Sequence, residues 1–137
     1  LDLTPTLSTI TDVAITAAAG TEYIVNDANG GAMTLPAAAS GIRIIILIGT
    51  TITSNTITIT AQSGDLLKGY AFLEKTDGAN NKTMFSPDGT DDLIITLNGS
   101  TKGGLVGDRI ELVGISATEW RVRAILSHTG TAATPFS

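Results

Sequence analysis

The sequence predicts an all-β fold, a small antiparallel β-sandwich or barrel-like domain with extended N- and C-terminal arms. Residues 41–60 join an apolar, β-branched run to a strict alternation of Ile and Thr, two patterns typical of strands. The chain is rich in Thr, Ile, Ala and Gly and poor in Lys, Glu and aromatic residues, which favours strands and turns over helices. Turn signals separate about nine short strands, and no amphipathic helical period appears.

The central stretch sets the pattern for the rest. Residues 42–48 are apolar except for Arg43, which fits a strand covered on both faces, whereas residues 56–60 fit a strand covered on one face. Ser54-Asn55 between them predicts a hairpin. A two-sided strand beside a one-sided strand indicates a core on one face of the sheet and a further layer on the other. That layer is expected to be a second sheet or a partner subunit.

The N-terminal third is predicted to start with an extended arm over residues 1–9. Leu1, Leu3 and Leu7 could dock this arm on a neighbouring subunit, and a frayed terminus is the alternative. Strands are then expected over 12–17, 21–25 and 32–35, with an Asn/Asp/Gly turn cluster at 26–31 and a stop at Pro36.

The C-terminal half is expected to hold further strands around two turn-rich stretches. Their ranges are 66–67 with 70–74, 82–85, 92–97, 108–115 and 120–126. Three glycines in residues 100–107 indicate a loop that passes close to other backbone. The short connection 116–119 predicts a hairpin of the last two strands.

The last strand separates two kinds of side chain by its period of two. Trp120 shares a face with Val122 and Leu126, so it is interpreted as core, with a sugar-stacking platform as the alternative. Arg121 and Arg123 point the other way, either as a solvated face or as an anchor for an acidic partner surface. The Thr/Ala/Gly-rich tail, 128–137, is expected on the surface or reaching toward a partner through Phe136.

Composition excludes several classes of function. The net charge is -5 and the eight basic residues are scattered singly, so neither a nucleic-acid footprint nor binding to an anionic membrane is expected. The chain has no cysteine, which removes thiolate metal sites and cysteine nucleophiles. No apolar run is long enough to span a bilayer, and no signal-peptide pattern starts the sequence.

No recognisable catalytic, cofactor or metal motif is present, so no catalytic, cofactor or metal residue is assigned and an enzyme is not expected. His128 has no evident nucleophile and is expected in an exposed loop. Asp88, Asp91 and Asp92 lie in an oxygen-rich loop without EF-hand spacing, so a solvated turn is favoured over a bound cation. The same reasoning applies to the asparagine and aspartate residues of 26–29. The sequence 101–104 lacks the P-loop order.

No strict internal repeat is visible, which argues against a solenoid or propeller. The domain organisation expected is therefore an N-terminal arm (1–9), one β domain (10–127) and a C-terminal tail (128–137).

Several segments together resemble small structural proteins of tailed-phage virions, with head decoration, or cement, proteins as the closest type. They are 33–41 (MTLPAAASG), 55–60 (NTITIT), 103–114 (GGLVGDRIELVG), 119–122 (EWRV) and the TGTAATPF tail. The resemblance implies a β-rich, commonly trimeric protomer on the outer capsid surface, with the major capsid protein as partner and assembly in the host cytoplasm. It carries no catalytic residues.

The expected function is therefore non-enzymatic: decoration and stabilisation of a phage capsid by a homotrimer that bridges neighbouring major capsid subunits. The alternative is a receptor- or glycan-binding module of a phage tail or fibre. The candidate partner contacts are Leu1, Leu3, Leu7, Arg121, Arg123 and Phe136.

Overall fold

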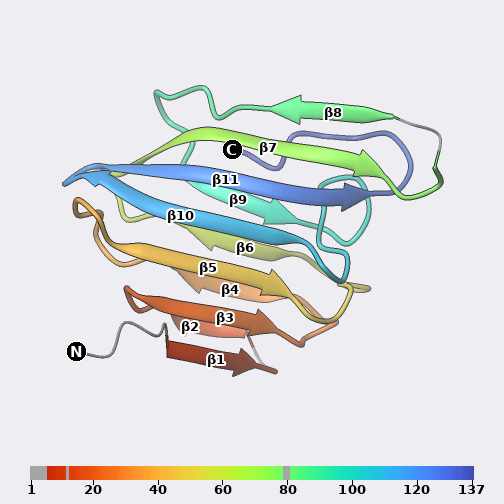
Figure 1. Cartoon of the computed structure of the whole chain (residues 1–137), viewed down its shortest axis with the longest axis horizontal. Helices are drawn as coiled ribbons and strands as arrows, with labels where there is room; N and C mark the ends of the chain where they lie inside the picture. Colours follow the sequence, from red (N-terminus) through yellow and green to blue (C-terminus); the bar gives the residue numbers. More distant parts are fainter. Residues whose placement is uncertain (1–5, 12, 79–80) are drawn as a thin grey trace.

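The computed structural model describes residues 6–11, 13–78 and 81–137, and these residues form strands and loops without a helix (Figure 1). None of them belongs to a helix that could cross a membrane. The strands are β1 (Thr6–Ile10), β2 (Val13–Thr16), β3 (Thr21–Val25), β4 (Gly31–Thr34), β5 (Arg43–Ile48), β6 (Ile57–Thr60), β7 (Leu66–Lys75), β8 (Lys82–Phe85), β9 (Ile94–Leu97), β10 (Arg109–Ser116) and β11 (Glu119–His128).

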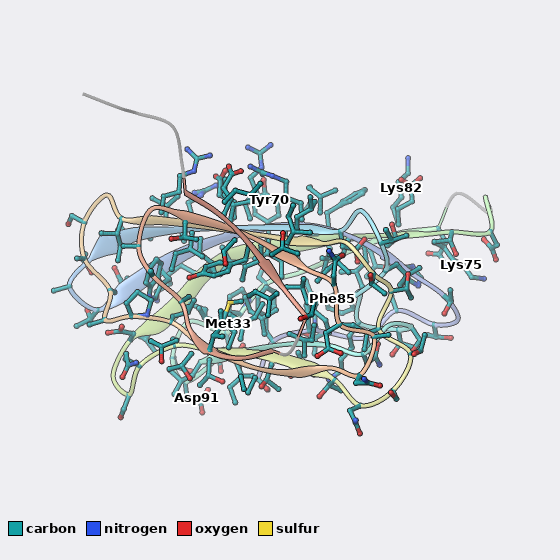
Figure 2. All side chains as sticks on the ribbon, turned by 90° about the horizontal axis from the view of Figure 1, so that it is seen from below. Met33, Tyr70, Lys75, Lys82, Phe85 and Asp91 are labelled. Carbon is teal, nitrogen blue, oxygen red and sulfur yellow. The ribbon has the colours of Figure 1, made fainter. Side chains whose placement is uncertain are left out.

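The strands form two mixed sheets that lie one over the other (Figures 1 and 2). The large sheet has seven strands in the order β1-β3-β5-β10-β11-β7-β8, and the small sheet has four in the order β2-β4-β6-β9. The all-β prediction is confirmed. The prediction of purely antiparallel pairing is wrong, because β1, β3 and β5 are mutually parallel, as are β11 and β7. Both sheets have free ends, so the described strands do not close into a barrel.

The core fills the space between the sheets. Alternate residues of each strand point inward, and Met33, drawn between the layers in Figure 2, is 1% exposed. Ile44, Ile46 and Ile48 of β5 meet the small sheet, which is the second sheet that the sequence required. Burying a side chain of this size contributes about 1.5–3 kcal/mol, so these alternating isoleucines account for much of the fold's stability.

The first half of the chain winds like a short solenoid, contrary to the prediction. Strands β1, β3 and β5 lie in the large sheet, and β2, β4 and β6 alternate with them in the small sheet; each set is parallel. Successive turns of this coil differ in length: Thr6 pairs with Thr21, whereas Glu22 pairs with Ile45. Because the turns differ in length, the sequence has no fixed repeat period that would indicate this coil.

The turn at Ser54-Asn55 exists but does not make a hairpin. Asn55 has a positive φ of 59°, as a turn residue of its type tolerates. The strands on either side, β5 and β6, lie in different sheets. The turn instead stacks on the preceding corner of the coil, since Asn55 Nδ2 donates to the Asn29 carbonyl at 3.0 Å and the Thr53 N–H donates to the Ala28 carbonyl at 2.9 Å.

The last two strands form the predicted hairpin, β10 with β11, and pair on opposite sides with β5 and β7. Trp120 is fully buried, which confirms its assignment to the core. The glycine loop before β10 does approach other backbone: a Cβ at Gly104 would lie 2.9 Å from the Gly99 nitrogen.

The C-terminal tail packs along β9 and does not project. Phe136 forms a bridge with Ile95 and is only 5% exposed. Its assignment as a partner contact is therefore wrong: the aromatic ring fills the core, where it stabilises this chain. His128, expected in an exposed loop, is the buried last residue of β11.

The N-terminal arm is only partly covered by the structure. Leu1 and Leu3 lie outside the described residues. Residues 6–9, expected as arm, belong to β1 and pair with β3. Leu7 lies on this strand with 61% of its surface exposed.

Candidate functional site: the outer face of the large sheet

The outer face is the side of the large sheet turned away from the small sheet. Tyr70 and Lys82 lie on it in Figure 2, Asp91 lies on the opposite side of the molecule, and Met33 lies between the layers. Strand register aligns its side chains in rows that run across the sheet. One row is Ile24, Leu47, Arg109, Ile125, Phe72 and Met84. The next is Ile45, Glu111, Arg123 and Tyr70, followed by Arg43, Val113, Arg121 and Lys68.

All the arginines of the sequence lie on this face. Arg43 is on β5, Arg109 is on β10, and Arg121 and Arg123 are on β11, which are three adjacent strands. In the sequence only Arg121 and Arg123 are close together, and Arg43 and Arg109 lie apart from that pair. The strand order gathers them, so an acidic chain carries one locally basic surface.

Two of these arginines have an acidic partner on the face itself. The Glu111 carboxylate pairs with the Arg43 guanidinium and lies 3.5 Å from that of Arg109. Lys68 Nζ lies 3.8 Å from a Glu119 oxygen and also donates to the Gly89 carbonyl at 2.9 Å. Exposed pairs of this kind contribute about 0–1 kcal/mol each, so they orient the side chains more than they stabilise the fold.

Arg121 and Arg123 differ, because their side chains are exposed and make no ion pair or hydrogen bond with any described residue. Arg123 lies between Glu111 and Tyr70 in register, and Arg121 lies between Val113 and Lys68. Their guanidinium groups therefore keep their donors available to a ligand or partner, in the fork geometry that suits carboxylates.

The apolar row beside the arginines is partly uncovered. Ile125 is 50% exposed and Met84 is 60% exposed. Phe72, which lies between them, and Leu47, which lies on the other side of Arg109, are half-buried. Of the two-sided pattern that residues 42–48 predicted, Leu47 lies in this row, and Ile45, which is only 9% exposed, lies in the next row of the same face. The exposure of Ile125 and Met84 shows that no described residue covers this end of the row.

Asp91, in the acidic loop before β9, lies on the other side of the molecule (Figure 2). The same loop also reaches the edge of the large sheet, where the Gly89 carbonyl accepts from Lys68 Nζ at 2.9 Å. Carboxylate oxygens of Asp88, Asp91 and Asp92 lie within 4.8 Å of one another. Hydrogen bonds from the N–H groups of Thr90 and Asp91 hold the pKa of Asp88 well below its usual value. Asp88 in turn raises the pKa of Asp91, through a hydrogen bond and through its charge. N–H groups of the loop itself thus donate hydrogen bonds to its carboxylates, as in an ordinary polar turn.

The remaining polar candidates are interior residues. Neither ring nitrogen of His128 has a hydrogen-bond partner among the described residues, and Ser127 points to the opposite face as the strand period predicts. No nucleophile or carboxylate is thus hydrogen-bonded to this imidazole, which a general base would need. Trp120 Nε1 is likewise buried without a partner, so this ring offers no platform to a sugar.

A buried carboxylate that the sequence did not single out organises the loop before β10. Asp108 is 2% exposed and accepts hydrogen bonds from the N–H groups of Gly104 at 2.8 Å, Leu105 at 3.1 Å and Ser127 at 2.8 Å. Burial raises its pKa, and the three N–H donors oppose that rise only in part. Its role is structural. The sequence Gly107-Asp108 did not reveal this role, because an Asp after a Gly is equally typical of an exposed turn.

The structure therefore places three of the predicted contact residues on one face, with Leu7 on β1 separated from the β11 pair by three strands, and adds others. Arg121, Arg123 and Leu7 share the outer face, whereas Phe136 is in the core. The sequence missed Arg43, Arg109, Tyr70 and Met84 as neighbours of this pair. The alternation within each strand indicated which side they take, but only the strand order places the strands side by side.

Comparisons of the chain with protein-family models, with curated proteins and with solved structures found no match. The outer face is thus characterised by its own residues alone.

Proposed function

We propose that this protein is a non-enzymatic structural component of a phage virion, which decorates the outside of the capsid and stabilises it by bridging neighbouring major capsid subunits. The observation that carries the proposal is the outer face, where unpaired arginines lie beside an uncovered apolar row. The resemblance of several segments to phage decoration proteins supports the same assignment.

The composition of the face favours a protein partner. Arg, Tyr, Phe and Met are enriched in the buried parts of protein interfaces, where a few such residues supply most of the binding energy. A nucleic acid would be bound chiefly through its phosphates by many basic groups, and here half of the arginines already share Glu111. The matching capsid surface would be acidic with an apolar centre.

The rest of the molecule suits a clamp. The two sheets hold the side chains of the outer face in rows fixed by strand register, so little conformational freedom is lost when the face binds. A protein that binds the assembled shell more tightly than its separated subunits stabilises the shell by mass action. Bond-making chemistry plays no part in this function.

The test is binding to purified shells that lack the protein. Wild-type protein is expected to co-sediment with the shells and to raise the temperature at which they rupture. Arg123→Glu and Arg121→Glu are each expected to weaken co-sedimentation at least tenfold, because truncating or reversing a desolvated charge at an interface costs about 2–5 kcal/mol.

Lys102→Glu is the matched control, since it changes the net charge equally but lies in the loop that joins β9 to β10, outside the strands that carry the outer face. It is expected to bind as the wild type does. Full occupancy without any change in rupture temperature would exclude the stabilising role, and equal weakening by Lys102→Glu would exclude the outer face as the contact.

The alternative, a receptor- or glycan-binding module of a tail or fibre, relied on Trp120 as a stacking surface. That ring is buried, and no other described observation favours a sugar ligand.

A further inference from the structure

Three of the four edge strands of the two sheets, β9, β8 and β1, are protected to different degrees. The small sheet's β9 is covered by the C-terminal tail, where the Thr96 N–H donates to the Pro135 carbonyl at 2.7 Å and Ser137 exchanges hydrogen bonds with Ile94. The large sheet's β8 is short and carries Lys82, a charge of the kind that discourages edge pairing. At its other end, β1 has no charged residue over 6–11, and no described strand or bridge lies along its outer side.

The backbone of β1 shows which groups face this open side. The Ile10 carbonyl accepts a hydrogen bond from the Asn26 N–H at 2.7 Å, so Ile10 turns its backbone groups toward β3. The N–H and C=O of one strand residue point to the same side, and successive residues alternate. Leu7 and Thr9 therefore direct their N–H and C=O groups outward, away from β3, which is a template for another strand.

We propose that a second copy of this chain pairs with β1 through its own β1, antiparallel, about a two-fold axis at Ser8. In that register Leu7 lies opposite the partner's Thr9, and Thr9 opposite the partner's Leu7, as hydrogen-bonded pairs that exchange bonds in both directions. Ser8 faces the partner's Ser8 in the intervening non-hydrogen-bonded pair. The result is one continuous sheet built from both large sheets.

A second copy fits this edge better than an unrelated strand for two reasons. The edge is uncharged, so pairing it with itself places no like charges opposite each other. A two-fold contact uses the same surface on both protomers. Each β1 therefore pairs the outward N–H and C=O groups of the other, and neither β1 is left with an open edge. Leu7, which is 61% exposed, gains the partner's Thr9 as a neighbour on the outer face.

The geometry has a consequence for the outer face. A two-fold axis perpendicular to the sheet leaves both outer faces on the same side, so the pair presents two sets of arginines in one surface. The inference does not depend on the proposed function, but two linked faces would bind a repetitive partner with avidity. It also differs from the trimer that the phage resemblance implies.

Sedimentation of the full-length chain provides the first test. The wild type is expected to be a dimer, and Thr9→Pro is expected to sediment as a monomer, because it removes an outward N–H while proline is tolerated in an edge strand. Met84→Pro is the control on the opposite edge. The Lys75 N–H donates to the Asn81 carbonyl at 3.0 Å, so Met84 faces away from β7 just as Thr9 faces away from β3. This variant is expected to remain a dimer.

A single introduced cysteine gives the second test, which does not depend on the fold of Thr9→Pro. The chain has no cysteine, and facing residues of a non-hydrogen-bonded pair lie about 4.5 Å apart at Cα, within the range that a disulfide spans. Ser8→Cys is expected to form a covalent dimer on mild oxidation, and Met84→Cys is expected to remain uncross-linked. A monomeric or trimeric wild type, a dimer that survives in folded Thr9→Pro, or a failure of Ser8→Cys to cross-link would each overturn the inference.

Discussion

At the scale of single residues, Asp108 shows how one buried carboxylate can fix a loop. Its two oxygens serve three backbone donors from two segments, 104–105 and Ser127. The glycine-rich chain before β10 has few side chains to pack, so these hydrogen bonds determine its path.

Asp108→Asn is expected to destabilise the protein by about 1–3 kcal/mol, the cost of leaving a buried polar group unsatisfied. An amide has one acceptor oxygen where the carboxylate has two, so at least one loop N–H would face another N–H group. Urea denaturation at neutral pH measures the loss. Equal m-values for the two proteins keep the comparison valid, and an unchanged midpoint would contradict the role of Asp108.

The pH dependence of stability, compared between the wild type and Asp108→Asn, tests whether burial or hydrogen bonding has the larger effect on the pKa of Asp108. Because burial raises the pKa of Asp108 above its ordinary value of 3.8, the folded state binds this proton more tightly than the unfolded state. The stability from this group is complete below pH 3.8 and is lost as the pH rises through the raised value.

The advantage of wild type over Asp108→Asn is therefore expected to be larger at pH 3 than at pH 7 when both are measured by urea denaturation. Since the variant does not titrate at this position, all other acids cancel in the difference. A larger advantage at pH 7 would mean that the N–H donors outweigh burial.

At the scale of elements, alternation predicted the strands well and their arrangement poorly. The Ile-Thr period of β6 and the two faces of β11 are local properties, and both are confirmed. Whether the chain after β5 folds back in the same sheet or crosses to the other depends on long-range packing, so Ser54-Asn55 could not decide it. Phe136 and His128 were misplaced for the same reason, since neither carries a local sign of the contacts that bury it.

The candidate site was predictable only in part. Arg121 and Arg123 were found because one strand's period places them together. Arg43 and Arg109 join them through β5 and β10, which are separated by many residues in the chain. Local patterns indicate which side of a strand a residue takes, and strand order decides its neighbours.

Close packing between β7 and β11 requires a glycine at position 69. Gly69 has a φ of +111°, and a Cβ there would lie 2.1 Å from the Val122 carbonyl oxygen. Gly69→Ala is expected to push these parallel strands apart and to cost about 1–3 kcal/mol, seen as a lower melting temperature in calorimetry.

Gly64→Ala is the control for backbone strain alone. Gly64 also has a positive φ, +91°, but nothing lies within 4 Å of its Cβ position. The difference between the two variants isolates the contact with β11, and equal losses would argue that this contact is unimportant.

At the scale of the whole molecule, charge is distributed unevenly. The net charge is -5, the arginines share the outer face, and Asp91 of the acidic loop lies on the far side (Figure 2). Such a molecule is oriented by the field of an acidic surface before contact is made.

Binding to shells is accordingly expected to weaken and to slow as salt is raised from 0.05 to 0.5 M, since the Debye length falls from above 10 Å to well below 8 Å over that range. Surface plasmon resonance on immobilised shells measures both rates. The double variant Arg121→Glu/Arg123→Glu is expected to show a much shallower dependence. Salt-independent binding of the wild type would indicate that the apolar row acts alone.

The uneven winding of the first six strands suggests a practical use. Equivalent corners of the coil already differ in length: residues 17–20 join β2 to β3, whereas 35–42 join β4 to β5. Lengthening an exposed loop costs little free energy, and nothing lies within 4 Å of the Cβ position at Gly20. A foreign peptide grafted between Ala18 and Ala19 would therefore be displayed to solvent while the stacked strands keep their register, which makes this corner a natural insertion point for epitope display.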